Sequence, residues 1–372
     1  MLLSLTSVAL LIWLAILLLP WRPWSTLERI EVSPHPAHPA LADITALIPA
    51  RDEAESITST LHALAQQGPL ASIILIDDQS NDGTANQARA LVLSNLQIID
   101  GAAPTPEWSG KLWALEQGFA RVTTPYTLLL DADIELSPGL LSALLEKLLA
   151  ENKEMVSVMA RLPMESWWEA LLIPPFIYFF KLIYPFALAN SRSRVVAAAA
   201  GGCILIRTAA LREIGGFAAL RGALIDDCTL ARKVKEAGGS VWLGLSQGVR
   251  AIRPYADLSS IWNMVARTAF TQLRYSSGLL LLCTLLMLVT FVVPLCGMWS
   301  DSSSVRVVAA LSLCLMFITY LPVLSYYGRT RWWLPTLPVA AALYLAMTWT
   351  SALRYWRGER SRWKDRVYER VS

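Results

Sequence analysis

Residues 72–85 read SIILIDDQSNDGTA, an apolar run that ends in two adjacent carboxylates. Ile73 to Ile76 are suited to the inside of a sheet, and Asp77 and Asp78 follow at once, before a polar turn. Comparable strand-like runs occur at 44–49, 96–100, 126–131 and 155–160, with helical patterns at 53–66, 82–94, 110–121 and 138–150. This alternation predicts βαβ units and a parallel sheet, which is an α/β fold.

Acidic residues stand at the ends of three of these predicted strands. Ligands of open parallel sheets bind beyond the carboxyl ends of the strands, so we expect these side chains to line one crevice. A helix cap is the alternative for any one pair, and Asp82 fits that alternative. Converged carboxylates require a cation or the donors of a ligand. The three sets are Asp52 with Glu53, Asp77 with Asp78, and Asp131 with Asp133.

The spacing Asp131-Ala132-Asp133, in YTLLLDADIEL at 126–136, indicates metal binding. Residues i and i+2 of an extended segment face the same side. Two hard oxygen ligands on one side suit Mg²⁺ or Mn²⁺ shared with a diphosphate. The motif is common on its own, but here it follows a strand and accompanies two other acidic strand ends. We therefore predict a divalent metal site at Asp131 and Asp133.

With these motifs, residues 42–278 resemble the family 2 glycosyltransferases, which have the GT-A nucleotide-sugar fold. SGKLWALEQG, at 109–118, is similar to the family's Gly-Lys-x-x-Ala-x-x-x-Gly loop. The resemblance implies a nucleotide-sugar donor, with UDP expected as the nucleotide. It places Lys111 near the nucleotide, and a solvated lysine at a helix start is the alternative. It also implies that Ala50, Asp52 and Glu53 surround the nucleotide, that Asp77 or Asp78 binds the uracil or ribose, and that Asp131 and Asp133 bind metal and diphosphate.

Two later segments resemble the acceptor and catalytic motifs of the same family. AAAAGGCILIR, at 197–207, is similar to the acceptor-side segment, in which Gly201 and Gly202 permit close approach to a sugar. LIDDCTLARKVKEAGG, at 224–239, matches the family's acidic-Asp-x-x-Leu motif. The resemblance aligns Asp227 with the catalytic base, and Asp226 replaces the commoner Glu. The alternative is that both acids only cap a helix ending at Gly238.

RTAFTQLRYS, at 267–276, occupies the place of the Gln-x-x-Arg-Trp motif that is typical of processive polysaccharide synthases. Only Arg274 matches, which favours a single transfer over processive synthesis. Arg267 and Arg274 are seven residues apart, so we expect them on one face of a helix. They would touch the diphosphate or anchor that helix to anionic lipid.

The two ends of the chain are apolar. Hydrophobic residues make up 55% of the sequence and charged residues 16%, against about 25% charged in soluble domains. Residues 1–19 carry no charge and precede Trp21-Arg22-Pro23-Trp24. A cleaved signal peptide would need a basic start and a small-residue cleavage site. We therefore predict an uncleaved anchor at 1–20 whose C-terminal end is cytoplasmic.

Three further apolar segments lie near 279–299, 305–327 and 332–353. The loop at 328–331 and the basic tail at 354–372 both carry the positive charge expected of cytoplasmic segments. Three full spans after a cytoplasmic domain would place that tail outside. Therefore either the positive charge does not mark the cytoplasmic side here, or one of the three segments does not cross the membrane.

The predicted domain at 25–278 begins near a Pro/His linker at 34–39 and contains an aromatic segment, SWWEALLIPPFIYFFKLIYPFALAN, at 166–190. Prolines break this segment, and Glu169 and Lys181 argue against a full span. We predict a helix pair at the membrane interface, which implies a lipid acceptor. The closest resemblance is to the bacterial hopene-associated glycosyltransferases. It predicts a multi-pass protein of the bacterial inner membrane with a cytoplasmic catalytic domain.

The predicted activity is an inverting, metal-assisted transfer of a sugar to a lipid, with a hopanoid as the candidate acceptor. A polyprenyl-phosphate acceptor, a nucleotidyltransferase and a non-catalytic membrane scaffold are the alternatives. The net charge of +3 is too small to indicate nucleic acid as a partner. Five cysteines without metal-type spacing favour a reduced, cytosol-facing domain.

Overall fold

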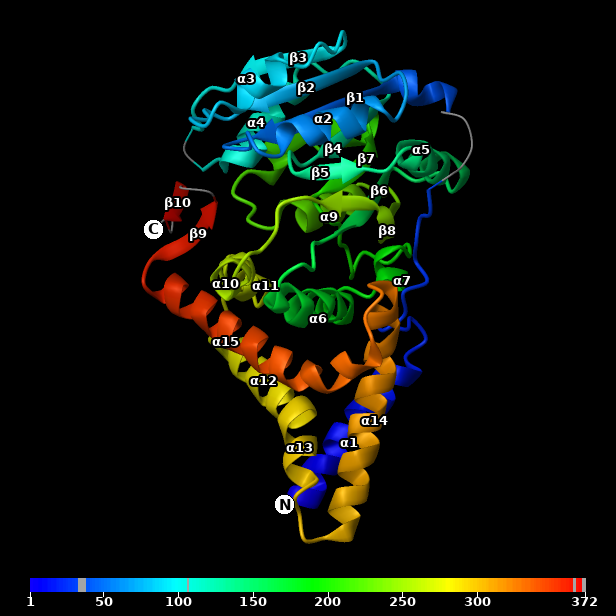
Figure 1. Ribbon diagram of the computed structural model, residues 1–372, viewed down its shortest axis with the longest axis vertical. Helices are drawn as coiled ribbons and strands as arrows, with labels where there is room; N and C mark the ends of the chain where they lie inside the picture. Colours follow the sequence, from blue (N-terminus) through cyan, green and yellow to red (C-terminus); the bar gives the residue numbers. More distant parts are fainter. Residues whose placement is uncertain (33–37, 106, 364–365, 370–372) are drawn as a thin grey trace. The chain divides into compact units, whose positions relative to one another are not determined.

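The computed structural model describes residues 1–32, 38–105, 107–363 and 366–369, so most of the predicted linker at 34–39 lies outside the described residues. The chain forms two compact units (Figure 1). We call Glu28–Pro163 with Leu188–Pro254 the α/β unit. We call Met1–Leu27 with Met164–Ala187 and Tyr255–Ser372 the helical unit. The predicted boundary at 278 differs from this division, because 255–278 clusters with the apolar helices.

The α/β unit is built on an eight-stranded sheet of order β3-β2-β1-β4-β7-β6-β8-β5. The five strands predicted from apolar runs are present. The remaining three, β5, β7 and β8, were not predicted. The strands are β1 (Ile44–Ala50), β2 (Ser72–Asp77), β3 (Leu96–Asp100), β4 (Tyr126–Leu130), β5 (Ile134–Leu136), β6 (Met155–Arg161), β7 (Cys203–Arg207) and β8 (Val241–Ala251).

The prediction of a parallel sheet is confirmed only in part, for β1 to β4 and for the parallel pairing of β6 with β8. β1 pairs in parallel with β2 and β4, and β2 pairs in parallel with β3. β7 is antiparallel to both β4 and β6, and β5 is antiparallel to β8. The parallel half comes from strand–helix–strand repeats. β5 and β7 do not follow such a repeat, so the alternation does not predict their direction.

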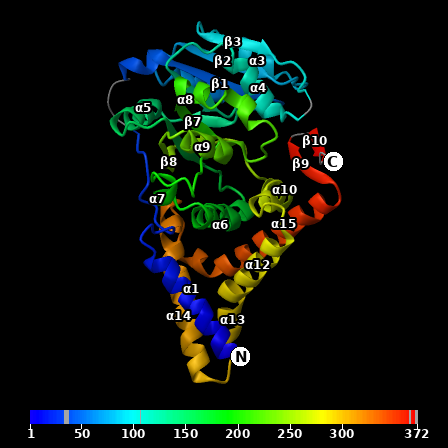
Figure 2. The same ribbon diagram turned by 180° about the vertical axis from the view of Figure 1, so that it is seen from behind.

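Helices cover both faces of this sheet (Figures 1 and 2). Alternate residues of β1 point to opposite faces, so Ile48 packs in one apolar cluster with Leu144 of α5 and Leu47 in another with Leu112 of α4. Both clusters are buried, which holds the strand ends in place. The helices are η1 (Pro39–Asp43), α2 (Ile57–Ala65), α3 (Thr84–Arg89), α4 (Gly110–Phe119), α5 (Leu140–Ala150), α8 (Thr208–Glu213), η2 (Gly216–Leu220) and α9 (Asp226–Glu236); α7 (Phe186–Ala189) contains the boundary between the units.

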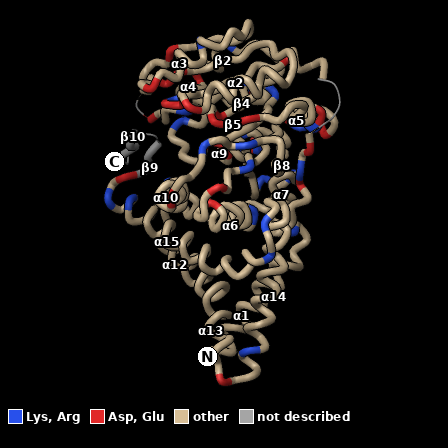
Figure 3. Tube along the Cα trace, in the orientation of Figure 1, with Lys and Arg blue, Asp and Glu red and all other residues tan. Residues whose placement is uncertain are grey.

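Among its described residues, the helical unit has three segments long and apolar enough to cross a membrane: Ser277–Gly297, Ser303–Tyr326 and Arg331–Trp356. A shorter apolar helix, Leu2–Leu18, lies within the predicted anchor. Charged residues are scarce along these helices (Figure 3). The elements are α1 (Leu2–Leu18), α6 (Trp167–Ile183), α10 (Leu258–Ala266), α11 (Ala269–Gln272), α12 (Ser277–Met287), η3 (Leu288–Val292), α13 (Val293–Gly297), α14 (Ser303–Tyr326), η4 (Arg331–Thr336), α15 (Leu337–Trp356) and the hairpin β9 (Glu359–Trp363) and β10 (Arg366–Glu369).

α1 is an integral part of the helical unit and packs along α14 and α13 (Figure 2). Its Thr6, Ala9 and Trp13 are fully buried. Pro294 has no N–H to offer the carbonyl of Thr290, four residues earlier. The indole Nε1–H of Trp13 donates to that carbonyl at 3.1 Å. This contact matters because an unsatisfied carbonyl is costly wherever water is excluded.

The aromatic segment at 166–190 differs from the prediction in one respect. α6 runs without a break through Pro174 and Pro175, and its last residue is Ile183. Its start is fixed by a capping box between Ser166 and Glu169. The Glu169 carboxylate also accepts the backbone N–H of Tyr255 at 2.7 Å, so this buried acid is explained by structure. The interfacial position predicted for the segment remains a prediction.

The expected single helix bearing Arg267 and Arg274 is not formed. α10 ends at Ala266, with Arg267 as its C-cap, and the short α11 follows. Arg274 lies beyond α11 with a φ of 51°, and Tyr275 follows with a φ of 57°. The two arginines therefore do not share a helix face. Arg274 belongs to the helical unit, so its predicted role at the nucleotide remains a prediction.

Candidate active site

Asp131, Ala132 and Asp133 form a tight turn between β4 and β5 and are not part of a strand. The N–H of Ile134 donates to the carbonyl of Asp131 at 3.2 Å, which closes the turn. The expectation of two carboxylates on one side of an extended segment is therefore wrong. The chain must turn here because β4 lies in the middle of the sheet and β5 at its edge.

Three neighbouring elements hold this turn in place. The hydroxyl of Thr60 on α2 donates to the carbonyl of Ala132 at 2.9 Å. Beyond the end of β8, the N–H of Ile252 donates to the carbonyl of Asp133 at 2.9 Å. The N–H of Asp131 donates to the carbonyl of Gly202, just before β7, at 3.1 Å. The positions of both carboxylates are thus set by backbone contacts from distant parts of the chain.

Lys111 joins two of the predicted acidic groups. It lies in the first turn of α4, whose N-cap Ser109 accepts the N–H of Leu112. Its Nζ is 2.6 Å from Oδ1 of Asp131 and 3.8 Å from Oδ2 of Asp226. Burial alone would lower the pKa of Lys111, but the nearby carboxylates outweigh it and raise that pKa. Lys111 is therefore an ion-paired lysine, and the alternative of a solvated one is wrong.

Asp227 lies in the first turn of α9, against the backbone of Gly201. A Cβ on Gly201 would lie 3.3 Å from Oδ2 of Asp227 and 3.6 Å from Nζ of Lys111. Oδ1 of Asp227 accepts the N–H of Cys228 at 2.7 Å. Burial, together with the charge of Asp226, raises the pKa of Asp227 to about 6. The N-cap residue of α9 is Ile225, so neither acid occupies the capping position of the alternative interpretation.

Asp133 and Glu53 share a cation that the sequence did not reveal. The guanidinium of Arg253 pairs with Glu53, and its Nε lies 3.7 Å from Oδ2 of Asp133. Burial and the charges of Asp131 and Glu53 raise the pKa of Asp133 to about 6, although Arg253 opposes this. Arg253 follows β8 and is 200 residues from Glu53, with no motif around it. Only the pairing of β8 with its neighbours brings it to the site.

The acidic residues after β1 and β2 take part in hydrogen bonds that connect the loop after β1 to the loop after β2. The N–H of Asp52, whose φ is 50°, donates to Ser80, and its carboxylate accepts the N–H of Asn81. Asp77 accepts the N–H of Ser80. Asp78 is buried, and its N–H donates to the carbonyl of Ala50 at 2.7 Å. The predicted contacts of these groups with a nucleotide remain predictions. Asp82 accepts the N–H groups of Ala54 and Thr84, but the N-cap residue of α3 is Gly83, so the interpretation of Asp82 as a helix cap is wrong.

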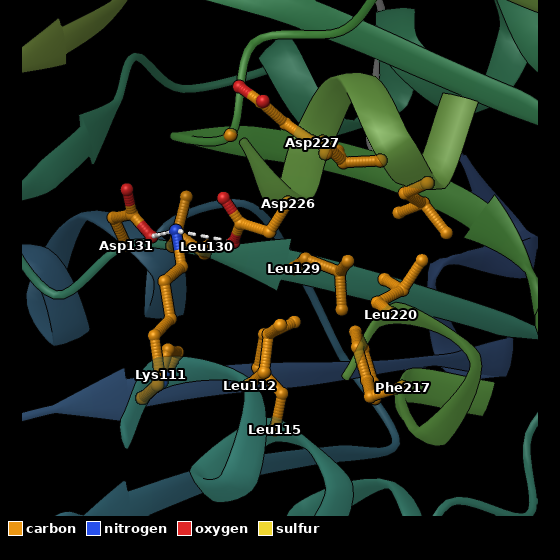
Figure 4. A pocket seen from close by; sticks show the side chains of 14 residues that line it. Lys111, Leu112, Leu115, Leu129, Leu130, Asp131, Phe217, Leu220, Asp226 and Asp227 are labelled. Carbon is orange, nitrogen blue, oxygen red and sulfur yellow. Dashed lines mark ion pairs between the residues drawn. The ribbon is translucent and has the colours of Figure 1, made fainter. Parts of the chain in front are cut away.

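A pocket in the α/β unit brings five of the predicted residues together (Figure 4). Lys111, Asp131, Gly201, Asp226 and Asp227 supply its polar part, and leucines with Phe217 supply the rest. Gly202 contacts the turn through its carbonyl. The pocket lining does not include Ala50, Asp52, Glu53, Asp77, Asp78 or Asp133, although Asp133 and Glu53 act on each other and on Asp131 electrostatically.

The carboxylates fit a metal shared with a ligand better than one held by protein alone. Among the described residues, no three His, Cys, Asp or Glu side chains form a metal-binding group. Asp131 and Asp133 are hard oxygen donors, and each already faces a cationic side chain. Mg²⁺ commonly uses one or two carboxylates plus the phosphates of a substrate. The donor set is therefore compatible with a divalent ion that enters together with a diphosphate.

Residues 45–215 match the family described as Glycosyl transferase family 2. The match covers somewhat less than half of the chain, and over this stretch the chain is similar to a family 2 glycosyl transferase domain. Curated relatives from two Staphylococcus aureus strains, bovine RF122 / ET3-1 and MRSA252, carry the name 4,4'-diaponeurosporenoate glycosyltransferase. Each is 34% identical over 91 residues, which is 24% of this chain and 24% of the relative. The chain thus spans about a quarter of the length of these curated relatives.

A solved structure shares the fold over almost the whole chain. The mannosyltransferase PcManGT of Pyrobaculum calidifontis, in complex with GDP-Man and Mn²⁺, is 17% identical with a TM-score of 0.56. The match covers 95% of this chain and 99% of that one. This agreement confirms the predicted GT-A fold.

Proposed function

We propose that the protein is a membrane-bound glycosyltransferase that moves a sugar from a nucleotide donor, expected to be a UDP-sugar, to a lipid acceptor. One observation carries this proposal: Lys111, Asp131, Asp226 and Asp227 meet in one pocket beyond the ends of the central strands. A fold needs no such cluster for stability, because close carboxylates repel and lose hydration. The cluster does suit a ligand that carries a diphosphate and a hydroxyl nucleophile.

The residues of the chain divide into two roles in this proposal. Asp227 accepts the proton of the acceptor hydroxyl as that oxygen bonds to the anomeric carbon. The bond from the anomeric carbon to the diphosphate oxygen breaks, and the nucleoside diphosphate leaves with the bonding pair. This single displacement inverts the anomeric centre. The ammonium of Lys111 would bind a donor oxygen, and it offsets the repulsion between Asp131 and Asp226.

A pKa of about 6 suits Asp227 for this task. The carboxylate is mostly ionised at neutral pH, and it is more basic than an ordinary aspartate. Gly201 lets it lie close to Lys111, since a larger residue there would crowd both groups. A divalent ion bound with the donor at Asp131 and Asp133 would offset the charge that develops on the departing diphosphate.

The acceptor is proposed from the helical unit and from the relatives. Three helices able to cross a membrane occur in the same chain as the glycosyl transferase domain. The curated relatives carry the name 4,4'-diaponeurosporenoate glycosyltransferase. A lipid that stays in the bilayer would need an enzyme held at that bilayer. A hopanoid is our first candidate, and a polyprenyl phosphate is the second, because its anionic head would be attracted to cytoplasmic basic residues.

The test is sugar transfer by the purified full-length chain in nanodiscs that contain bacterial lipids. Radiolabelled UDP- and GDP-sugars are supplied separately with Mn²⁺, and lipids are extracted and fractionated. We expect label from a UDP-sugar in a neutral lipid fraction, with at least about a hundredfold less formed by Asp227→Asn. Label in an acidic polyprenyl fraction would replace the hopanoid by the second candidate. Absence of transfer from every donor would overturn the proposed activity in favour of a non-catalytic scaffold.

A further inference from the structure

We propose that α15 lies in the membrane interface on the cytoplasmic side and does not cross the bilayer. Its partner is the headgroup and upper acyl region of that leaflet. The chain then crosses the membrane three times, through α1, through the α12–α13 segment and through α14. This inference concerns the helical unit and does not depend on the proposed reaction.

The direction of α15 is the first argument. α1, α13 and α14 run along a common direction within the helical unit, whereas α15 runs across it (Figures 1 and 2). α15 packs mainly on α10, α11, α12 and α6, and α1 packs mainly on α14 and α13. Of the three candidate spans, the segment that includes α15 is also the least apolar. Length and composition permit it to span, but it runs across the direction of α13 and α14, and besides α12 it packs on α10 and α11.

The exposed face of α10 sets the depth of α15. The exposed residues Ser259, Asn263 and Arg267 recur every four positions, so they form one polar face on and just after α10. Such a face is unsuited to hydrocarbon. α10 is tied to α15 along its length: the indole of Trp262 donates to Thr350 at 3.1 Å, and Arg354 donates to Asn263 at 2.7 Å. α15 therefore lies at the depth of a helix that faces water or headgroups.

α15 itself has the two faces of an interfacial helix. Its buried residues, among them Leu337, Ala341, Tyr344, Met347 and Ser351, face the rest of the helical unit. A second stripe is exposed and apolar, and it consists of Val339, Ala342, Trp349, Leu353 and Trp356. Trp332 precedes the helix and is 89% exposed. An apolar stripe with tryptophans and flanking arginines is what the headgroup boundary binds.

Charge distribution then agrees with the topology. With α15 in the interface, two crossings after the α10–α11 segment return the chain to its starting side. Arg22, Arg29, Arg329, Arg331 and the basic tail at 354–372 all fall on the cytoplasmic side. The turn between α13 and α14, at 298–302, falls outside and contains no Lys or Arg. If α15 crossed, the tail with its arginines would lie outside, against the charge rule.

The experiment measures the depth of single labels in the full-length protein. Ala342→Cys lies near the middle of the 331–356 segment, and Leu311→Cys lies near the middle of α14; both side chains are exposed. Each is made in a background without Cys283, Cys296 and Cys314 and labelled with a bimane in proteoliposomes. Nitroxide lipids with a shallow or a deep quencher report the depth. We expect shallow quenching to exceed deep quenching at Ala342, and the reverse order at Leu311.

The side of the tail is measured independently. A green fluorescent protein fused to the C-terminus should fluoresce in bacterial cells, and an alkaline phosphatase fusion should be inactive. Ser300→Cys in the α13–α14 turn should react with an impermeant maleimide in intact cells, which verifies the outer side. A label at Ala342 quenched most strongly by the deep quencher would overturn the proposal. So would an active phosphatase fusion, because it requires a fourth crossing.

Discussion

At the scale of single residues, neighbouring charges and burial set the protonation behaviour of Asp227 and Lys111. Lys111 contacts Asp131 and lies near Asp226, so its charge offsets part of the acidic cluster. Asp227 is left with a raised pKa because it is buried and faces Asp226. A carboxylate in this state is destabilised in its charged form, and a proton from a substrate relieves that destabilisation.

Asparagine substitutions at Asp227 and at Asp133 are expected to reduce sugar transfer for different reasons. Asp227→Asn keeps the shape of the side chain but cannot accept a proton, so transfer should fall by about 10²–10⁴-fold with nearly normal donor binding. Asp133→Asn removes a hard anionic ligand, so Mn²⁺ affinity, nucleotide affinity and transfer should weaken together. The test measures donor affinity and single-turnover transfer for both variants. Wild-type transfer by Asp227→Asn would show that the base lies elsewhere.

The raised pKa of Asp227 predicts the pH dependence of transfer. The group must be ionised to accept a proton, so kcat should fall as the pH drops below about 6 and reach a plateau above it. The same shift costs stability above that pH, because the folded state then holds a charge that the unfolded chain tolerates better. Asp227→Asn should therefore raise Tm at pH 8 and change it little at pH 4. A profile that stays flat down to pH 4.5 would contradict this assignment.

Arg253 is expected to matter for stability through the two acids beside it. Arg253→Met leaves the buried Glu53 and the partly buried Asp133 without their cation, so Tm should fall. Added Mn²⁺ should restore more of the Tm in this variant than in the wild type, since it replaces the missing charge. Arg250→Met is the matched control, because Arg250 also lies in this segment and pairs with Glu135 at the surface. Equal Tm losses in both variants would argue against a special role for Arg253.

At the scale of elements, α1 and the α12–α13 segment depend on each other. The proline at position 294 leaves a carbonyl that α1 satisfies through Trp13. Phe291 also packs edge-on against the Trp13 ring at 5.4 Å between centroids. This pairing explains why α1 is a structural helix of the unit, and the anchor predicted at 1–20 remains a prediction.

Trp13→Phe should therefore destabilise the helical unit. The aromatic packing is largely retained, but the hydrogen bond to Thr290 is lost, which costs about 1 kcal/mol. Thermal unfolding in detergent should show a lower Tm for this variant. Trp299→Phe serves as the control, because Trp299 is 91% exposed and should tolerate the change. An unchanged Tm for Trp13→Phe would mean that the carbonyl finds another donor.

At the scale of the whole molecule, ligand binding should appear as stabilisation. A ligand at 100 times its Kd stabilises the folded state by about 2.7 kcal/mol. We expect UDP with Mn²⁺ to raise Tm, and EDTA to abolish that rise. EDTA alone should leave Tm unchanged, since Lys111 and Arg253 already offset the charges of Asp131 and Asp133. Equal stabilisation by UDP with and without EDTA would remove the metal from the proposal.

The sequence by itself determined the first half of the sheet and the acidic groups at its edge. Local periodicity predicts β1 to β4, and residues at strand ends must meet at one edge whatever the remaining fold. The sequence also located the apolar helical segments, because helices compatible with lipid differ strongly in composition from the α/β unit.

Only the tertiary structure decided how these groups are paired. Residues 131–133 form a turn and not the extended segment that the spacing predicted, because β5 pairs with β8 at the far edge. Arg253 reaches Glu53 from 200 residues away, and Trp13 reaches Thr290 from 277 residues away. α15 matches a spanning helix in composition, yet its packing partners place it across the others. Local sequence reports local preferences, whereas such contacts depend on which distant segments the packed core brings together.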